Sequence, residues 1–226
     1  MSVNIFTPDP LLGGFYTMTE AARLLRIENK QRIYRWLTSD EAVITRDYQP
    51  IRGAQELSFW DLFEVRFVEA FRAQGFSLQF LRKVANKARA DFNVKHPFAL
   101  SNSKYLTDRK KIFCKVAEET GEKTHDVLSG QYEMYETIEN ILAKDVEFNP
   151  KTLLAEEWPP YAECPHVIIN PRYAYGQPVI GEKKIPTAAI YRLWKVESNK
   201  DRVASWYGVR PSDLDEAIEF EVRLAG

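Results

Sequence analysis

The feature that most restricts the fold of this chain is a run of prolines in its second half. Glu157-Trp158-Pro159-Pro160 is followed by Pro165 and Pro171. Consecutive prolines cannot continue a helix, because each lacks an amide hydrogen and its ring fixes φ. The run therefore predicts an extended connector between folded segments. We expect it to end near residue 160, which leaves a small C-terminal domain over residues 161–226.

Residues 1–90 have the pattern of a winged helix-turn-helix domain. Thr17 and Glu20 have the spacing of a capping box, which predicts that a short helix begins there. Asn29 is expected to cap a second short helix over residues 30–37. Two short helices joined by a tight turn form the helix-turn-helix unit.

Two short strands over residues 43–46 and 55–57, with a turn between them, have the size of a wing. A strongly periodic helix follows from Ser58, with phenylalanines spaced by four, and Ser77 is expected to cap the next helix. The phenylalanine stripe is expected to face the core of its own domain. The segment 91–160 is predicted to hold a hairpin over 105–116, a helix over 131–142 and the Pro-rich connector.

A cluster of basic residues lies on the second short helix and on the turn before it. From Arg23 to Arg35 there are five basic residues and one acid, Glu28. Such a surplus suits DNA phosphates, and amide and guanidinium groups can read base edges. A solvated face of an amphipathic helix is the other interpretation. The candidate DNA-binding residues are Thr17, Thr19, Arg23, Asn29, Lys30, Gln31, Arg32, Tyr34 and Arg35, with Arg46 and Arg52 in the wing.

Three segments of this region resemble the winged helix-turn-helix of MerR-type regulators. They are residues 16–25 (YTMTEAARLL), 32–37 (RIYRWL) and 74–78 (QGFSL). The resemblance implies a dimer that reads a two-fold operator, with the second helix in the major groove and the wing on the DNA backbone. The chain departs from that family after residue 90, where no long heptad helix follows.

The C-terminal domain has a helical pattern of its own. A short strand is predicted over 167–169, and three helices over 187–196, 199–207 and 212–224. Thr187, Ser198 and Ser212 are expected to cap these helices, and Gly208 is expected to end the second. Residues 165–224 resemble a small helix-turn-helix family of unknown function. That family recurs in VapB-type antitoxins, which are usually encoded beside a PIN-domain ribonuclease. The resemblance therefore implies a PIN-domain toxin as partner.

The last helix carries five acidic residues and one late arginine, so we do not expect it to enter the major groove. A PIN-type ribonuclease holds metal with clustered carboxylates, and the resemblance implies that an inhibitor presents a cation to them. The candidate partner-binding residues are Arg172, Lys183 and Lys184. Arg172 is preferred because Pro171 would hold it rigidly. Solvated loop charges are the other interpretation. Arg109, Lys110 and Lys111, at the turn of the predicted hairpin, are further available cations.

Nothing in the sequence predicts an enzyme. Cys114 and Cys164 have no Cys-x-x-Cys spacing, and the three histidines are scattered, so we expect neither a metal site nor a cofactor. The sequence contains no phosphate-binding glycine loop and no nucleophile elbow. It has neither a signal-peptide pattern nor an apolar run long enough for a membrane helix. We expect a cytoplasmic protein that is nucleoid-associated when it is bound to DNA.

The sequence thus predicts a mainly α protein with small β elements: a winged helix-turn-helix followed by a small three-helix domain. The leading hypothesis is a DNA-binding antitoxin that neutralises a PIN-domain ribonuclease and represses its own operon. A homodimer is expected, because one recognition helix covers few base pairs. The alternatives are a MerR-like regulator whose C-terminal region senses a ligand or dimerises, without a toxin partner, and a structural adaptor without a DNA role.

Overall fold

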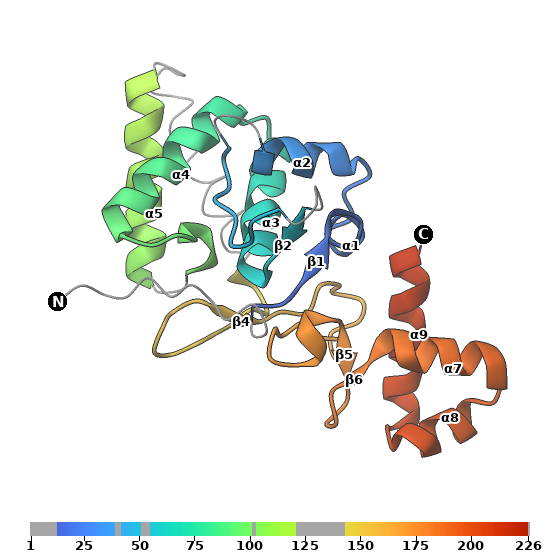
Figure 1. Cartoon of the computed structure of the whole chain (residues 1–226). Helices are drawn as coiled ribbons and strands as arrows, with labels where there is room; N and C mark the ends of the chain where they lie inside the picture. The colour runs from blue at the N-terminus through green and yellow to red at the C-terminus, as the bar shows by residue number, and fades with distance from the viewer. Residues whose placement is uncertain (1–12, 39–41, 51–54, 101–102, 121–142, 226) are drawn as a thin grey trace. The chain divides into compact units, whose positions relative to one another are not determined.

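The computed structural model describes residues 13–38, 42–50, 55–100, 103–120 and 143–225 of the chain. Within these ranges the chain is mainly α-helical, with short antiparallel strand pairs (Figure 1). The predicted class, mainly α with small β elements, is confirmed at this level. No helix in the described ranges is long and apolar enough to cross a membrane.

The chain divides into two compact units, and each is assembled from separate stretches of sequence. Unit 1 comprises the described residues within 31–49 and 60–155. Unit 2 comprises those within 13–30, 50–59 and 156–225. Unit 2 therefore contains stretches from both ends of the sequence. The domain boundaries expected at residues 90 and 160 stay a prediction.

The N-terminal part of unit 2 begins with β1 (Tyr16–Thr17), which leads directly into α1 (Met18–Leu24). The predicted capping box is confirmed. The Thr17 hydroxyl oxygen accepts from the Glu20 amide at 3.2 Å, and the Glu20 carboxylate accepts from the Thr17 amide at 2.8 Å. β1 pairs in antiparallel register with β2 (Glu56–Leu57). The start of α1 is thus fixed by its cap and by a strand.

The C-terminal part of unit 2 closely follows the sequence-based prediction. Its elements are η2 (Ala174–Gly176), β5 (Val179–Ile180), β6 (Ile185–Pro186), α7 (Thr187–Glu197), α8 (Lys200–Tyr207) and α9 (Pro211–Ala225). All three predicted helices are confirmed. The strand expected over 167–169 is reduced to single bridges, from Ile168 to Val179 and from Ile169 to Trp158.

The helix ends in this part differ from the prediction in three places. Asn199, not Ser198, caps α8, because its side chain accepts a backbone hydrogen bond from the first turn. Ser198 instead ends α7 with a positive φ of 55°. Thr187 and Ser212, expected as caps, lie inside α7 and α9. Gly208 ends α8 with a φ of 62°, as predicted.

Unit 1 is built from helices around an aromatic core. Its elements are α2 (Lys30–Thr38) from residue 31, α3 (Phe59–Ala73) from residue 60, α4 (Leu78–Phe92), η1 (Pro97–Ala99), α5 (Ser103–Thr120), β3 (Glu147–Phe148) and the first residue of β4 (Ala155–Glu157). Phe67 stacks on Phe98 with ring centroids 3.6 Å apart. Phe113 lies edge-on to Phe76 and Phe80 at 5.0 and 4.7 Å. The phenylalanine stripe of α3 faces this core, as predicted.

The hairpin predicted over 105–116 is wrong, because these residues lie within α5 (Figure 1). Ile112, Phe113 and Val116 have helical spacing and are buried. Arg109 resembled a turn residue but is buried, and its Nη1 donates to the carbonyls of Pro97 at 2.8 Å and Leu100 at 3.0 Å. The helix predicted over residues 131–142 lies outside the described residues.

The predicted wing is also wrong where its strands are described. Val43 and Ile44 are buried, but they form no strand, because both amides donate to the carbonyl of Trp36, at 3.1 and 3.2 Å. They close the C-terminal end of α2 instead. β2 falls within the predicted second strand but pairs with β1. Buried β-branched residues produced the strand pattern without a strand.

Candidate functional site

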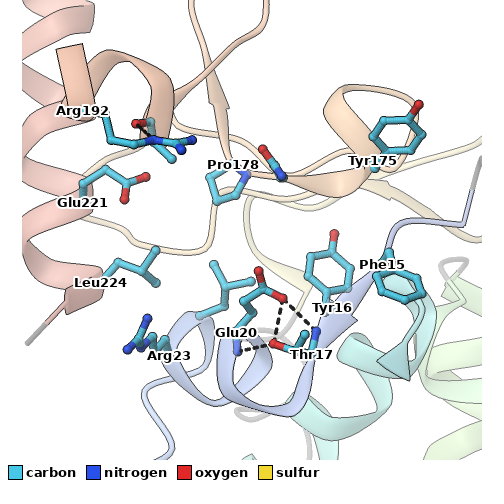
Figure 2. A pocket seen from close by; sticks show the side chains of 13 residues that line it. Phe15, Tyr16, Thr17, Glu20, Arg23, Tyr175, Pro178, Arg192, Glu221 and Leu224 are labelled. Carbon is cyan, nitrogen blue, oxygen red and sulfur yellow. Dashed lines mark hydrogen bonds between the residues drawn. The ribbon is translucent and has the colours of Figure 1, made fainter. Parts of the chain in front are cut away.

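A cleft in unit 2 is the candidate functional site (Figure 2). Its volume is about 760 Å³. One wall comes from residues 15–24, a second from residues 175–178, and a third from side chains of α7 and α9. Segments from both ends of the sequence therefore form one concave surface. Binding sites are commonly concave, with apolar walls and a few polar groups.

The base of the cleft is fixed by two hydrogen bonds between distant segments. The Tyr16 hydroxyl donates to the Gly176 carbonyl at 2.8 Å, and the Phe15 amide donates to the Tyr175 carbonyl at 3.1 Å. Gly176 has a φ of 84°, and a Cβ atom there would lie 2.4 Å from the Tyr16 hydroxyl oxygen. Only glycine fits this close approach.

Tyr175 stands at the rim of the cleft on strained backbone (Figure 2). Ala174 and Tyr175 both have a positive φ, of 46° and 58°. Such a conformation is unfavourable for residues with a Cβ and is concentrated at functional sites. The Tyr175 side chain is 64% exposed, and Phe15 across from it is 49% exposed. Tyr175 on the strained turn and Phe15 in the N-terminal segment are thus two exposed aromatic side chains of the cleft lining.

Four charged side chains complete the lining. Figure 2 shows Glu20 and Arg23 on α1 facing Arg192 on α7 and Glu221 on α9. Burial raises the pKa of the Glu221 carboxyl, although it accepts from the Thr187 hydroxyl at 2.5 Å and lies near Arg192. Apolar and aromatic walls with charged groups of both signs around them are typical of surfaces that bind other proteins.

The C-terminal end of α1 and the residues that follow it contact Tyr161 and Glu163 within unit 2. The Arg26 guanidinium lies 4.1 Å from the ring centroid of Tyr161 and donates to Glu163 at 3.2 Å. The bond to Glu163 raises the pKa of Arg26. The Tyr161 hydroxyl donates to the Arg23 carbonyl at 2.9 Å. Arg26, one of the five basic residues of the predicted cluster, therefore makes an internal ion pair.

The predicted DNA-binding residues are divided between the two units, because the boundary falls between Lys30 and Gln31. In unit 2, Thr17 belongs to the capping box, Arg23 lines the cleft, and the Thr19 hydroxyl accepts from Lys30 at 3.2 Å. Asn29 and Lys30 are exposed. Thr17 and Thr19 are thus engaged locally.

In unit 1, α2 carries the rest of this set on a mixed surface. Gln31, Tyr34 and Arg35 are exposed, whereas Arg32 pairs with Glu69 on α3 at 2.8 Å. Ile33 and Trp36 are buried. Arg46 is half-buried, and Arg52 lies outside the described residues.

The predicted partner-binding residues do not line the cleft. Arg172 is exposed and pairs with Glu156. Lys183 donates to the Tyr207 carbonyl at 3.4 Å. Lys184 lies 5.5 Å from the ring centroid of Tyr173. All three remain candidates on the loops around β5 and β6.

His166 and Cys164, near the Pro-rich connector, make contacts within unit 2. The His166 ring lies 2.7 Å from the Glu216 carboxylate. Cys164 is a buried free thiol, and burial raises its pKa to about 11. A thiol in such a site stays protonated and unreactive.

Sequence reasoning missed the cleft residues Phe15, Tyr175, Arg192 and Glu221. Their signal was weak, because the pairing of residues 15–17 with the loop at 175–178 joins segments far apart in the sequence. The one local sign was Gly176 beside Tyr175 in a proline-rich loop, a pattern typical of a tight turn that does not identify the segment with which the turn pairs.

A comparison with protein families finds a match in the C-terminal part of the chain. Residues 167–220 match a family described as "Protein of unknown function (DUF433)". This match bears out the predicted resemblance of residues 165–224 to a small family of unknown function. It covers only that segment, so the MerR-like resemblance of the N-terminal region stays a prediction.

Two matches come from Mycobacterium tuberculosis, one to a named protein and one to a crystal structure. The chain is 27% identical over 228 residues to a protein named "Putative antitoxin VapB45", with 90% of this chain and 92% of that protein covered. The fold of this chain is similar to that of the crystal structure of Rv2018, with a TM-score of 0.70 and 24% identity. The match covers 93% of this chain and 98% of that chain. The second likeness concerns the fold alone.

Proposed function

We propose that this chain is the antitoxin of a type II toxin–antitoxin system. The observation that carries the proposal is the similarity to the VapB45 relative along nine tenths of the chain. A match of this extent includes both units, not only the C-terminal segment. The proposed role is regulatory binding rather than enzymatic catalysis, as expected from the sequence.

The proposed toxin-binding surface is the cleft of unit 2. Exposed aromatic side chains contribute most to binding when a partner buries them, and Phe15 and Tyr175 stand exposed at its rim. The turn holds the backbone of Tyr175 in one conformation, which would reduce the backbone entropy lost on binding. The proposed toxin is a PIN-domain ribonuclease, and Arg172 is the cation proposed to contact its acidic site.

The second proposed activity is repression of the chain's own operon. The proposed contacts to duplex DNA include the exposed Tyr34 and Arg35 on α2. A homodimer would read two half-sites of the operator. The proposed complex acts in the cytoplasm and is nucleoid-associated when it is bound to DNA.

Co-purification tests the proposal directly. The full chain, tagged and co-expressed with the product of the adjacent gene, is expected to elute as one complex in size-exclusion chromatography. It is also expected to restore growth to cells that express that gene alone. A PIN-domain ribonuclease from an unrelated operon is the control and should not bind. Separate elution of the two adjacent products would contradict the antitoxin role.

A ligand-sensing regulator is the second candidate, and the size of the cleft favours it. A volume of about 760 Å³ lies within the range of small-molecule sites. Such a regulator would bind operator DNA but not the adjacent gene product. Its affinity for DNA would also change when the cleft is filled.

A further inference from the structure

A histidine lies between two carboxylates in the interior of unit 1. The Nε2 atom of His96 lies 3.0 Å from Asp47 Oδ1, and its Nδ1 atom lies 3.9 Å from Asp61 Oδ1. The His96 side chain is 5% exposed, and the two aspartate side chains are 1% and 0% exposed. A neutral imidazole has only one N–H, so it can donate to only one of the two. An imidazolium has an N–H on each nitrogen: the one on Nε2 donates to Asp47, and the one on Nδ1 faces Asp61 at 3.9 Å as an ion pair without a hydrogen bond.

The other charges around His96 come from each element packed against it. Lys95, in the connection after α4, lies 2.7 Å from the same Asp47 oxygen. Glu64 on α3 accepts from the Phe98 amide at 3.1 Å and lies 3.6 Å from Arg89 on α4. Among the residues that the structure describes, the carboxylates of Asp47, Asp61 and Glu64 lie near Arg89 and Lys95, and a protonated His96 adds a third positive charge. Loss of the His96 proton removes that charge from between two buried aspartates, which is unfavourable.

The cluster fastens one segment of unit 1, residues 42–49, which we call the latch segment. Asp47 anchors it twice, through its side chain and through its amide, which donates to Asp61 Oδ2 at 3.1 Å. Arg89 donates to the Val43 carbonyl at 2.7 Å. The latch segment directly follows α2 along the chain, and its Val43 amide donates to the Trp36 carbonyl.

Asp47, Asp61 and His96 also place one possible ligand atom each within 4.8 Å of one another. The Asp47 oxygen that meets His96, however, also accepts from the Lys95 ammonium group. A metal ion would have to displace both donors and take the lone pair of a neutral ring. The side chains therefore supply the positive charge themselves.

We propose that His96 is a proton-operated latch: when protonated, it holds residues 42–49 against α3 and α4, and when it loses its proton it releases them. The functional consequence rests on the proposed DNA-binding role. Release would loosen the C-terminal end of α2 and the position of Arg46, and operator affinity would fall as pH rises. The nearby carboxylates hold the pKa of His96 above its ordinary value, although burial opposes them.

Hydrogen exchange on the full chain tests the latch without DNA. Protection of the latch-segment amides, corrected for intrinsic exchange, is expected to fall between pH 6 and pH 8.5. The fall is at most about tenfold for each unit by which the folded pKa of His96 exceeds the unfolded one. His96→Gln should show low protection at both pH values. The matched control His166→Gln alters an exposed histidine of unit 2 and should behave like the unaltered chain.

Protection that is independent of pH in the unaltered chain would overturn the proposal. If His96→Gln does not fold, the His96 ring resonance in the unaltered chain decides instead. A midpoint at or below the ordinary value near 6.5 would also overturn it. Loss of protection on adding EDTA at pH 6 would show a metal site, which excludes the latch. If the latch responds but no operator binds, the DNA-binding proposal fails while the latch stands.

Discussion

The hydroxyl of Tyr16 donates a hydrogen bond of 2.8 Å to the carbonyl of Gly176, a residue 160 positions later in the sequence. The contact is buried and joins β1 to the turn that presents Tyr175. The first two walls of the cleft, from residues 15–24 and 175–178, are therefore joined although they lie far apart in the sequence. A C-terminal fragment would lack one wall, so binding experiments require the full chain.

Removal of this hydroxyl should destabilise unit 2. Tyr16→Phe keeps the ring but leaves the buried Gly176 carbonyl without this donor, which costs about 1–3 kcal/mol. Urea unfolding followed by circular dichroism measures the change in the free energy of unfolding. Tyr34→Phe is the control, because that tyrosine is exposed. Equal stability of the two variants would show that the hydrogen bond contributes little.

Gly176→Ala should be more damaging than a substitution that only strains the backbone. The backbone at residue 176 has a φ of 84°, which is strained for alanine. The added Cβ would also lie 2.4 Å from the Tyr16 hydroxyl oxygen. Gly75→Ala is the matched control, since Gly75 has a φ of 89° but no atom within 4 Å of the added Cβ. The control should lose about 1–2 kcal/mol, and Gly176→Ala should lose more. Thermal denaturation that ranks them in the reverse order would contradict the close approach.

Much of the fold could be predicted from the sequence where the signal is local. The capping box at Thr17 and the three C-terminal helices follow from spacing and end signals within a few residues. The strand expected at 43–46 failed because Val43 and Ile44 are buried by capping α2, and burial alone does not distinguish the two arrangements. The prediction of a hairpin turn at Arg109 was wrong because this arginine, a residue type that is usually solvated, is buried and donates hydrogen bonds to two buried carbonyls.

The cleft could not be predicted for a different reason. Its walls meet through the Tyr16–Gly176 and Phe15–Tyr175 hydrogen bonds, which no periodicity within either segment reports. The basic residues near α1 were visible in the sequence, but their partners were not. Arg26 makes an ion pair with Glu163, which lies far along the chain. Local patterns therefore identified the charged residues and left their use open.

Truncation of the rim aromatic should weaken toxin binding. Tyr175→Ala removes an exposed ring that the proposed partner would bury, and truncation of an aromatic residue that dominates an interface costs about 2–4 kcal/mol. Isothermal titration of the full chain with the adjacent gene product measures the Kd. Trp206→Ala is the matched control, because this ring is 58% exposed but does not line the cleft. A larger loss for Trp206→Ala would move the interface to α8.

Removal of one exposed cation from α2 should weaken operator binding and its salt dependence. Arg35→Ala is expected to reduce the slope of log affinity against log salt by about 1, because one phosphate contact is lost. Fluorescence anisotropy with promoter DNA over a salt series gives this slope. Lys111→Ala, which removes an exposed cation from α5, is the control and should keep the slope. If both variants bind like the unaltered chain, α2 is not the contacting helix.

The stability of unit 1 should fall as pH rises from 6.5 to 8.5. The folded pKa of His96 lies above its unfolded value of 6.5, so its contribution is complete below pH 6.5 and is lost as pH rises through the folded pKa. Burial also raises the pKa of the Glu64 carboxyl, so the contribution of Glu64 to the free energy of unfolding likewise falls as pH rises. This window lies below the ordinary pKa of a cysteine thiol, so Cys164 does not contribute to the change. The free energy of unfolding in urea, measured at intervals across the window, should decline for the unaltered chain and decline less for His96→Gln. A decline of equal size in both proteins would assign the pH dependence to a group other than His96.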